Sequence, residues 1–229
     1  MSALPRKNSA RAIVITVAAA VVLAIGAVVY ALAQRAPAPE AAPDGTLQTT
    51  RADSHVLDDG GADAVTVVEF LDFECEACAA FSPIVENLRA EHAGEITYVV
   101  RYFPLPGHIN STQAALAAEA AAQQGRFEDM YHRLFETQAE WSHASSETPA
   151  VFRAHAEALG LDLTAYDAAI ADPATLARIQ ADKVDGEALG VTGTPSFFVD
   201  GMYVRLQEWD DLDEAITDAL QNAPRPDGE

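Results

Sequence analysis

The sequence of 229 residues is short of cysteine and of basic residues. Two cysteines exclude a fold held together by several disulfide bonds, and a chain of this length can bury a core without them. Fourteen lysines and arginines stand against 35 aspartates and glutamates, which gives a formal charge of −21. Because nucleic-acid binding needs cations opposite the phosphates, we expect no nucleic-acid partner.

The acidic residues are also missing from one part of the chain, since none precedes Glu40. That part contains an uninterrupted apolar run, residues 12–33, with basic residues in front of it. As a helix the run would be about 33 Å long, close to the roughly 30 Å of a bilayer core. We therefore expect a single transmembrane helix at 12–33, with residues 1–11 in the cytoplasm and the remainder extracytoplasmic.

An alternative for this apolar run is a cleaved signal peptide, which would make the protein secreted. Residues 31–33 (Ala-Leu-Ala) resemble a small-residue cleavage site, although the run is longer than the usual apolar core of a signal peptide. Both interpretations export the part that follows. Residues 34–50 are rich in proline and alanine and predict an extended linker, and residues 223–229 are expected to form a short tail.

Residues 51–222 combine strand-like and helix-like segments, which predicts an α/β domain with a small sheet covered by helices. Strands are expected at residues 65–71, 95–103, 196–199 and 202–206. Helices are expected at residues 77–92, 110–125, 127–135, 148–159, 175–189 and 208–221. In the second helix, Gln113 stands at the capping-box spacing from Asn110. Asp200-Gly201 is a hairpin turn signal between the last two strands.

Both cysteines lie where an apolar strand passes into a helix, in the sequence Cys75-Glu76-Ala77-Cys78. The unpaired N–H groups and the dipole of a helix N-terminus favour a thiolate, which is the attacking species in disulfide exchange. Three positions along the helix, Cys78 lies on the same face. A disulfide closing so short a loop would add little stability, so we expect a redox-active pair.

One alternative and one local complication remain for this pair. None of the six histidines has a tight ligand spacing to the cysteines, but a distant one could complete a copper site, as in a metallochaperone. Asp72, Glu74 and Glu76 crowd Cys75. Negative neighbours raise the pKa of a thiol, which would make the couple less oxidising unless these carboxylates point into solvent.

Two segments together carry a family resemblance: VTVVEFLDFECEAC at 65–78 and GVTGTPSFFVDG at 190–201. The stretch 51–222 resembles the DsbA-like branch of the thioredoxin superfamily. The resemblance implies a thioredoxin-like fold with a helical insertion at about residues 108–189. It also implies that an exposed Cys75 forms the mixed disulfide with a client protein and that a more buried Cys78 resolves it.

Three further residues acquire expected roles from the same resemblance. Pro195 would be a cis-proline beside the cysteines, and the backbone of Thr194 would pair with an extended substrate strand. Glu69 would be a buried acid with a raised pKa that exchanges a proton with Cys78. An alternative for Glu69 is a side chain that reaches solvent from the end of its strand.

The resemblance implies an extracytoplasmic thiol–disulfide oxidoreductase without a cofactor, most simply a dithiol oxidase, with a reductase as the alternative. Its partners would be exported proteins with cysteine thiols and a membrane redox partner, which the resemblance implies to be quinone-linked. No dimerisation segment is evident, so we expect a monomer rather than an isomerase. Glu76 and Ala77 stand where many relatives have proline first and the best-known oxidant has histidine second; its oxidising power is not carried over.

Overall fold

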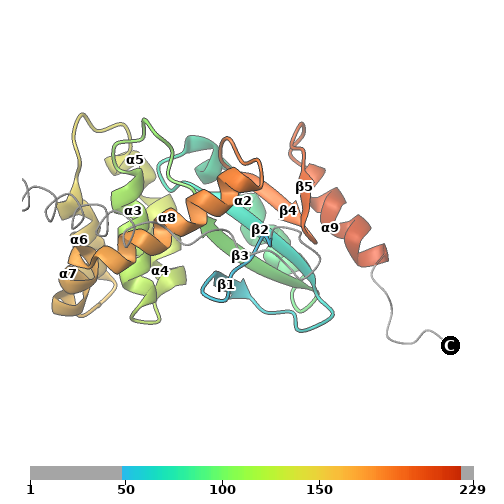
Figure 1. The fold of residues 1–229 in the computed structure, drawn as a ribbon, viewed down its shortest axis with the longest axis horizontal. Coiled ribbons are helices and arrows are strands. Elements are labelled where there is room, and N and C mark those ends of the chain that lie inside the picture. Colours follow the sequence, from blue (N-terminus) through green and yellow to red (C-terminus); the bar gives the residue numbers. More distant parts are fainter. Residues whose placement is uncertain (1–47, 223–229) are drawn as a thin grey trace, which may run out of the picture. The chain divides into compact units, whose positions relative to one another are not determined.

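The structure is a computed structural model that describes residues 48–222, and its centre is a five-stranded mixed sheet (Figure 1). The strands are β1 (His55–Asp58), β2 (Val65–Leu71), β3 (Ile96–Tyr102), β4 (Ser196–Val199) and β5 (Met202–Val204). Their order is β1-β3-β2-β4-β5. β2 and β3 are parallel, and the other neighbouring pairs are antiparallel.

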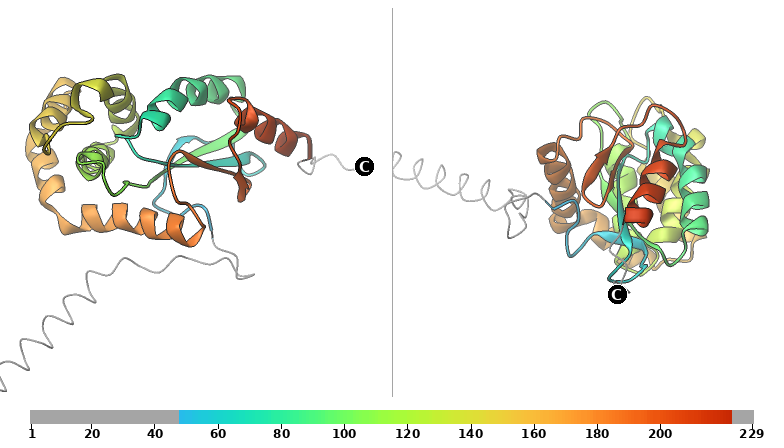
Figure 2. Two further views of the ribbon diagram at one scale, coloured as in Figure 1. Left: turned by 90° about the horizontal axis from the view of Figure 1, so that it is seen from above. Right: turned by 90° about the vertical axis from the view of Figure 1, so that its right-hand side faces the viewer.

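Helices lie on both faces of the sheet and form a separate layer beside it. They are α2 (Glu76–Glu91), α3 (Ser111–Ala122), α4 (Phe127–Glu136), α5 (Gln138–Trp141), α6 (Pro149–Ala158), α7 (Leu163–Ala171), α8 (Pro173–Ala188) and α9 (Asp211–Asn222). Figure 2 shows α2 and α9 on one face and the long α8 on the other. Helices α3–α8 form the insertion between β3 and β4, which agrees with the expected range of about 108–189.

β2 is apolar along its whole length because both faces of the sheet are covered. Val67 and Leu71 join the cluster that contains Phe81 and Val85 of α2. Val68 and Phe70 join a second cluster on the opposite face. Side chains alternate along a strand, so Glu69 lies on the same side as Val67 and Leu71, towards α2.

The insertion is built around α3, whose alanines are almost all buried. Small side chains let α4, α6, α7 and α8 pack around this helix. The predicted capping box is wrong, because the side chain of Asn110 does not cap α3. Instead its amide donates to the carbonyl of Trp141 (3.1 Å) and its oxygen accepts from the N–H of Thr148 (2.8 Å). A fully buried amide is better satisfied by these tertiary partners.

The predicted transmembrane helix at 12–33, most of the linker at 34–50, and the tail at 223–229 lie outside the described residues. Of the helices between residues 48 and 222, none has both the length and the apolar character that crossing a bilayer requires.

Candidate active site

The two cysteines lie at the N-terminus of α2, directly after the loop that leaves β2. Cys75 is the N-cap residue, and Cys78 lies in the first turn. Both are free thiols. Cys78 is the more buried, at 1% exposure, but Cys75 is exposed by only 6%, so the expectation of an exposed Cys75 is wrong. The loop before β4 covers it.

That loop belongs to the second sequence motif, residues 190–201. It contacts the first motif, residues 65–78, at Cys75. The thiol of Cys75 donates a hydrogen bond to the backbone carbonyl of Thr194, with a sulfur–oxygen distance of 3.3 Å. The peptide bond between Thr194 and Pro195 is cis, as the resemblance implied. Residues separated by about 120 positions in the chain therefore form one site.

The surroundings of Cys75 lower its pKa from 9.0 to about 6. The largest cause is a hydrogen bond from the Cys78 thiol, opposed by burial and assisted by the side chain of Thr194 and by the backbone N–H groups of Cys78 and Ala77. These donors stabilise the thiolate in the way expected of a helix N-terminus. The net shift of the pKa is downward, and the three neighbouring acids are not among its main causes.

The carboxylate of Asp72 is occupied by other groups. It accepts hydrogen bonds from the backbone N–H of Glu74 (2.9 Å) and of Leu105 (3.0 Å). It also lies 2.6 Å from Nδ1 of His108. Asp72 is 2% exposed, so it does not point into solvent either; it ties the active-site loop to the segment after β3.

The two glutamates beside Cys75 are also paired. Glu74 is buried and accepts a hydrogen bond from the backbone N–H of Asn110 at 2.6 Å. Glu76 is exposed and lies 2.7 Å from Nε2 of His143. His143 adopts a positive φ of 57°, and its backbone N–H faces Glu74 at 3.3 Å. Each of these carboxylates thus has a polar partner within hydrogen-bonding distance.

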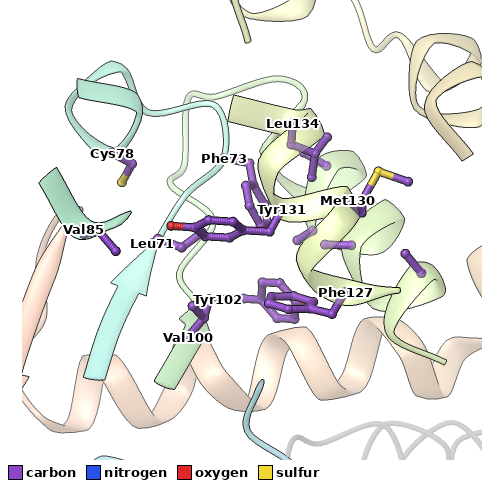
Figure 3. Close-up of a cluster of buried hydrophobic side chains, with 14 of the residues drawn as sticks. Leu71, Phe73, Cys78, Val85, Val100, Tyr102, Phe127, Met130, Tyr131 and Leu134 are labelled. Carbon is purple, nitrogen blue, oxygen red and sulfur yellow. The ribbon is translucent and has the colours of Figure 1, made fainter. Parts of the chain in front are cut away.

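Glu69 and Cys78 form the buried side of the site. Glu69 is 1% exposed, which excludes the alternative of a side chain reaching solvent. Burial raises its pKa to about 7, although the hydroxyl of Tyr98 donates to it at 2.7 Å and lowers the pKa. The pKa of Cys78 is raised well above 9.0 by burial, then by its hydrogen bond to Cys75 and by the charge of Glu69. Cys78 belongs to the buried apolar cluster drawn in Figure 3.

Sequence reasoning missed two residues of this site. Tyr98 could have been found, because a hydroxyl inside an apolar strand that pairs with β2 needs a partner. Gln138 could not have been found, because no neighbouring residue in the sequence indicates a role for it. Its side-chain amide donates to the backbone carbonyls of Phe73 (2.8 Å) and Cys75 (2.9 Å). Within residues 48–222, no three His, Cys, Asp or Glu side chains gather as a metal-ligand set.

Comparison with known proteins identifies the family. A family model described as thioredoxin matches residues 56–218. The chain belongs to the thioredoxin family. Its solved structural neighbours include a thioredoxin-like oxidoreductase from Silicibacter pomeroyi, with 29% identity, a TM-score of 0.63, and coverage of 76% of this chain and 96% of the other.

Two further neighbours share the fold of this thioredoxin-family chain. BdbD from Bacillus subtilis is 23% identical, with a TM-score of 0.66 and coverage of 74% of this chain and 94% of the other. The α-DsbA1 protein of Wolbachia pipientis is 21% identical, also with a TM-score of 0.66, over 76% and 94% of the two chains. These likenesses show that the chain has the fold of these DsbA-type proteins, with a cysteine pair at the N-terminus of α2.

Curated relatives match 60% of this chain with a small part of much longer proteins. The Na(+)/H(+) antiporter NhaA 1 of Mycolicibacterium gilvum is 37% identical over 142 residues, which are 60% of this chain and 22% of that protein. The protein of the same name from Salinispora arenicola is 42% identical over 139 residues, 60% of this chain and 20% of that protein. The chain thus spans about a fifth of the length of these relatives.

Proposed function

We propose that this protein is a membrane-anchored, extracytoplasmic dithiol oxidase that introduces disulfide bonds into exported client proteins. The observation that carries the direction is the lowered pKa of Cys75, about 6. A stabilised thiolate favours the reduced form of the couple, and a couple whose reduced form is stabilised is a stronger oxidant. Cys75 is then also a good leaving group when the client is released.

The proposed reaction starts from the Cys75–Cys78 disulfide. A client thiolate attacks the sulfur of Cys75, the bond between Cys75 and Cys78 breaks, and Cys78 leaves as a thiolate. A second client thiolate then attacks the client sulfur of the mixed disulfide and expels Cys75 as a thiolate. Two electrons pass from the client dithiol to the enzyme, which ends as the dithiol form found in the structure.

Glu69 supplies the proton that Cys78 needs in this scheme. The pKa of Cys78 lies well above 9.0, so its thiolate takes up a proton as soon as it is released. Glu69 has a pKa of about 7, so a large share of it carries a proton at neutral pH. In the reverse direction, the ionised form of Glu69 would accept the proton of Cys78. No cofactor is required, because the exchange uses sulfur atoms alone.

Client recognition is assigned to the backbone around Thr194 and Pro195. The Thr194 carbonyl already faces the sulfur of Cys75, at 3.3 Å. An extended client segment that pairs with this backbone would bring its cysteine directly to Cys75, in the manner of an added strand. Main-chain pairing accepts many side chains, which suits an enzyme that acts on many exported proteins.

The proposed setting is the outer face of a membrane, with the enzyme as a monomer anchored by residues 12–33. A membrane redox partner, which we propose to be quinone-linked, then reoxidises the Cys75–Cys78 pair. The relatives named as Na(+)/H(+) antiporters support a membrane setting, because an antiporter works in a membrane. Labelling of reduced cells with an impermeant thiol reagent, before and after permeabilisation, tests the location; labelling of Cys75 only after permeabilisation would contradict it.

The direction of electron flow is tested by the reduction potential of the cysteine couple. A value near −120 mV supports an oxidase, and a value near −270 mV supports the reductase alternative, on the scale set by strong and weak oxidants of this type. Oxidation of a dithiol peptide by wild-type protein and by Cys75→Ser checks the site itself. Full activity of Cys75→Ser would refute the role of Cys75. Client proteins trapped on Cys78→Ala would identify the substrates.

A further inference from the structure

The loop that presents Cys75 is held by the helical insertion rather than by the sheet. Phe73 and Cys75 lie between the end of β2 and the start of α2, outside any strand pairing. Their carbonyl oxygens both face the insertion, where the Gln138 side-chain nitrogen donates to them at 2.8 Å and 2.9 Å. One amide group therefore uses both of its hydrogens on the two carbonyls that flank Glu74.

Gln138 is well placed to hold this loop because its own position is fixed. It is 7% exposed and opens α5. The preceding Thr137 donates its hydroxyl to the carbonyl of Arg133 at 2.7 Å and lies 3.1 Å from Nε2 of His155. A side chain anchored in this way loses little entropy when it donates, so its hydrogen bonds persist.

The carbonyl of Cys75 has a second role, which links Gln138 to the reactive sulfur. It accepts the first backbone hydrogen bond of α2, from the N–H of Ala79 at 3.1 Å. The same peptide therefore sets the direction in which α2 begins. The thiolate of Cys75 depends on that direction, because the backbone N–H groups of Ala77 and Cys78 must face the sulfur.

We infer that Gln138 is a positioning residue for Cys75. Its amide orients the Phe73 and Cys75 carbonyls, so that the sulfur of Cys75 stays at the N-terminus of α2 and next to the Thr194 carbonyl. This inference rests on the proposed role of Cys75 as the reacting sulfur. It also gives the insertion a part in the chemistry, since α5 acts on the active site through two hydrogen bonds.

The test replaces Gln138 by methionine in the full-length protein. Methionine has a similar length and no donor, so both carbonyls lose their partner while the volume is kept. We expect the alkylation of Cys75 by iodoacetamide at pH 6 to slow about 3- to 10-fold, the range that corresponds to one hydrogen bond. The midpoint of the alkylation profile should move to higher pH, and the couple should become less oxidising.

The matched control is Gln123→Met, which removes another side-chain amide bond within the insertion, from Gln123 to the hydroxyl of Thr175 at 3.1 Å. Both variants should lower the melting temperature, but only Gln138→Met should change the alkylation profile. A Gln138→Met protein that melts earlier and keeps the wild-type profile would overturn the inference, because the role would then be purely structural.

A second variant covers the case in which Gln138→Met does not fold. Gln138→Glu keeps the shape, and its protonated form can donate to one carbonyl, whereas its ionised form can donate to neither. The alkylation of Cys75 should then acquire a second pH step, and a single step identical to that of the wild type would refute the inference. Alkylation needs no client and no oxidant, so failure of the proposed oxidase direction leaves this result unchanged.

Discussion

The hydrogen bond between the two thiols is the largest cause of the lowered pKa of Cys75, so its removal should have a measurable effect. With a pKa of about 6, about 90% of Cys75 is ionised at pH 7, whereas a thiol with a pKa of 9 would be about 1% ionised. The Cys78→Ala variant loses the donor, and its Cys75 should titrate well above 6. Thiolate absorbance near 240 nm and the rate of alkylation against pH both measure this midpoint.

A matched variant separates the hydrogen bond from the loss of packing. Cys78→Ser keeps a hydroxyl donor at nearly the same place, so the pKa of its Cys75 should lie below that of Cys78→Ala. A wild-type midpoint at 8.5 or above would refute the reasoning from the structure. Equal midpoints for wild type and Cys78→Ala would refute the assignment to Cys78 and leave the backbone N–H groups as the cause.

The same lowered pKa makes the stability of the reduced protein depend on pH. Because the pKa of Cys75 is lower in the folded chain, folding favours the thiolate, and this contribution is complete only above the unfolded value of about 9. It is lost as the pH falls through about 6. The melting temperature of the reduced protein, relative to the oxidised protein, should therefore rise between pH 6 and pH 9; a constant difference would contradict the shift.

Three other substitutions test the buried side of the site and the packing of the fold. Glu69→Gln should slow turnover about 100-fold, the usual scale for loss of a proton-transfer group, and should remove a pH step near 7; an unchanged pH profile would contradict the role. Tyr98→Phe removes the hydroxyl that lowers the pKa of Glu69, so the pH step of Glu69 should move above 7. A step at an unchanged or lower pH would contradict this effect of Tyr98. Gly186→Ala would place a methyl group 2.8 Å from the Phe103 ring and should cost about 1–3 kcal/mol. Gly193→Ala, which meets nothing within 4 Å, is the control by thermal melting.

The parts of the fold that could be predicted have strong local signals. β2 was predicted with its observed bounds, Val65–Leu71, because burial on both faces makes the strand apolar throughout. β1, α5 and α7 have no counterpart among the predicted elements. β1 has four residues at the edge of the sheet, with a register shift between Val56 and Asp58. α7 had a signal, since Asp162 caps it through the N–H of Thr164, but the segment is short and largely exposed.

The residues of the candidate site also divide into those with a local sequence signal and those without one. The cysteine pair, Glu69 and the Thr194-Pro195 motif could be named in advance because each has a position relative to a strand or a helix. The contact from Gln138 to Cys75 joins residues 63 positions apart and depends on how α5 packs against the active-site loop. No pattern of neighbouring residues encodes such a contact, so only the folded chain reveals it.

The acids beside Cys75 show why the number of charges nearby in the sequence does not predict the pKa of a reactive thiol. A carboxylate raises the pKa of a thiol only if its charge faces the sulfur without nearer compensation. Asp72 and Glu74 are buried, and a buried carboxylate has to be met by donors; each is, through the N–H groups of Leu105 and Asn110. The donors that satisfy these acids also compensate their charge, which weakens its effect on the pKa of Cys75. Buried and hydrogen-bonded, these two acids fix the conformation of the active-site loop. The pKa of Cys75 is set mainly by the Cys78 thiol and by the backbone N–H groups at the start of α2.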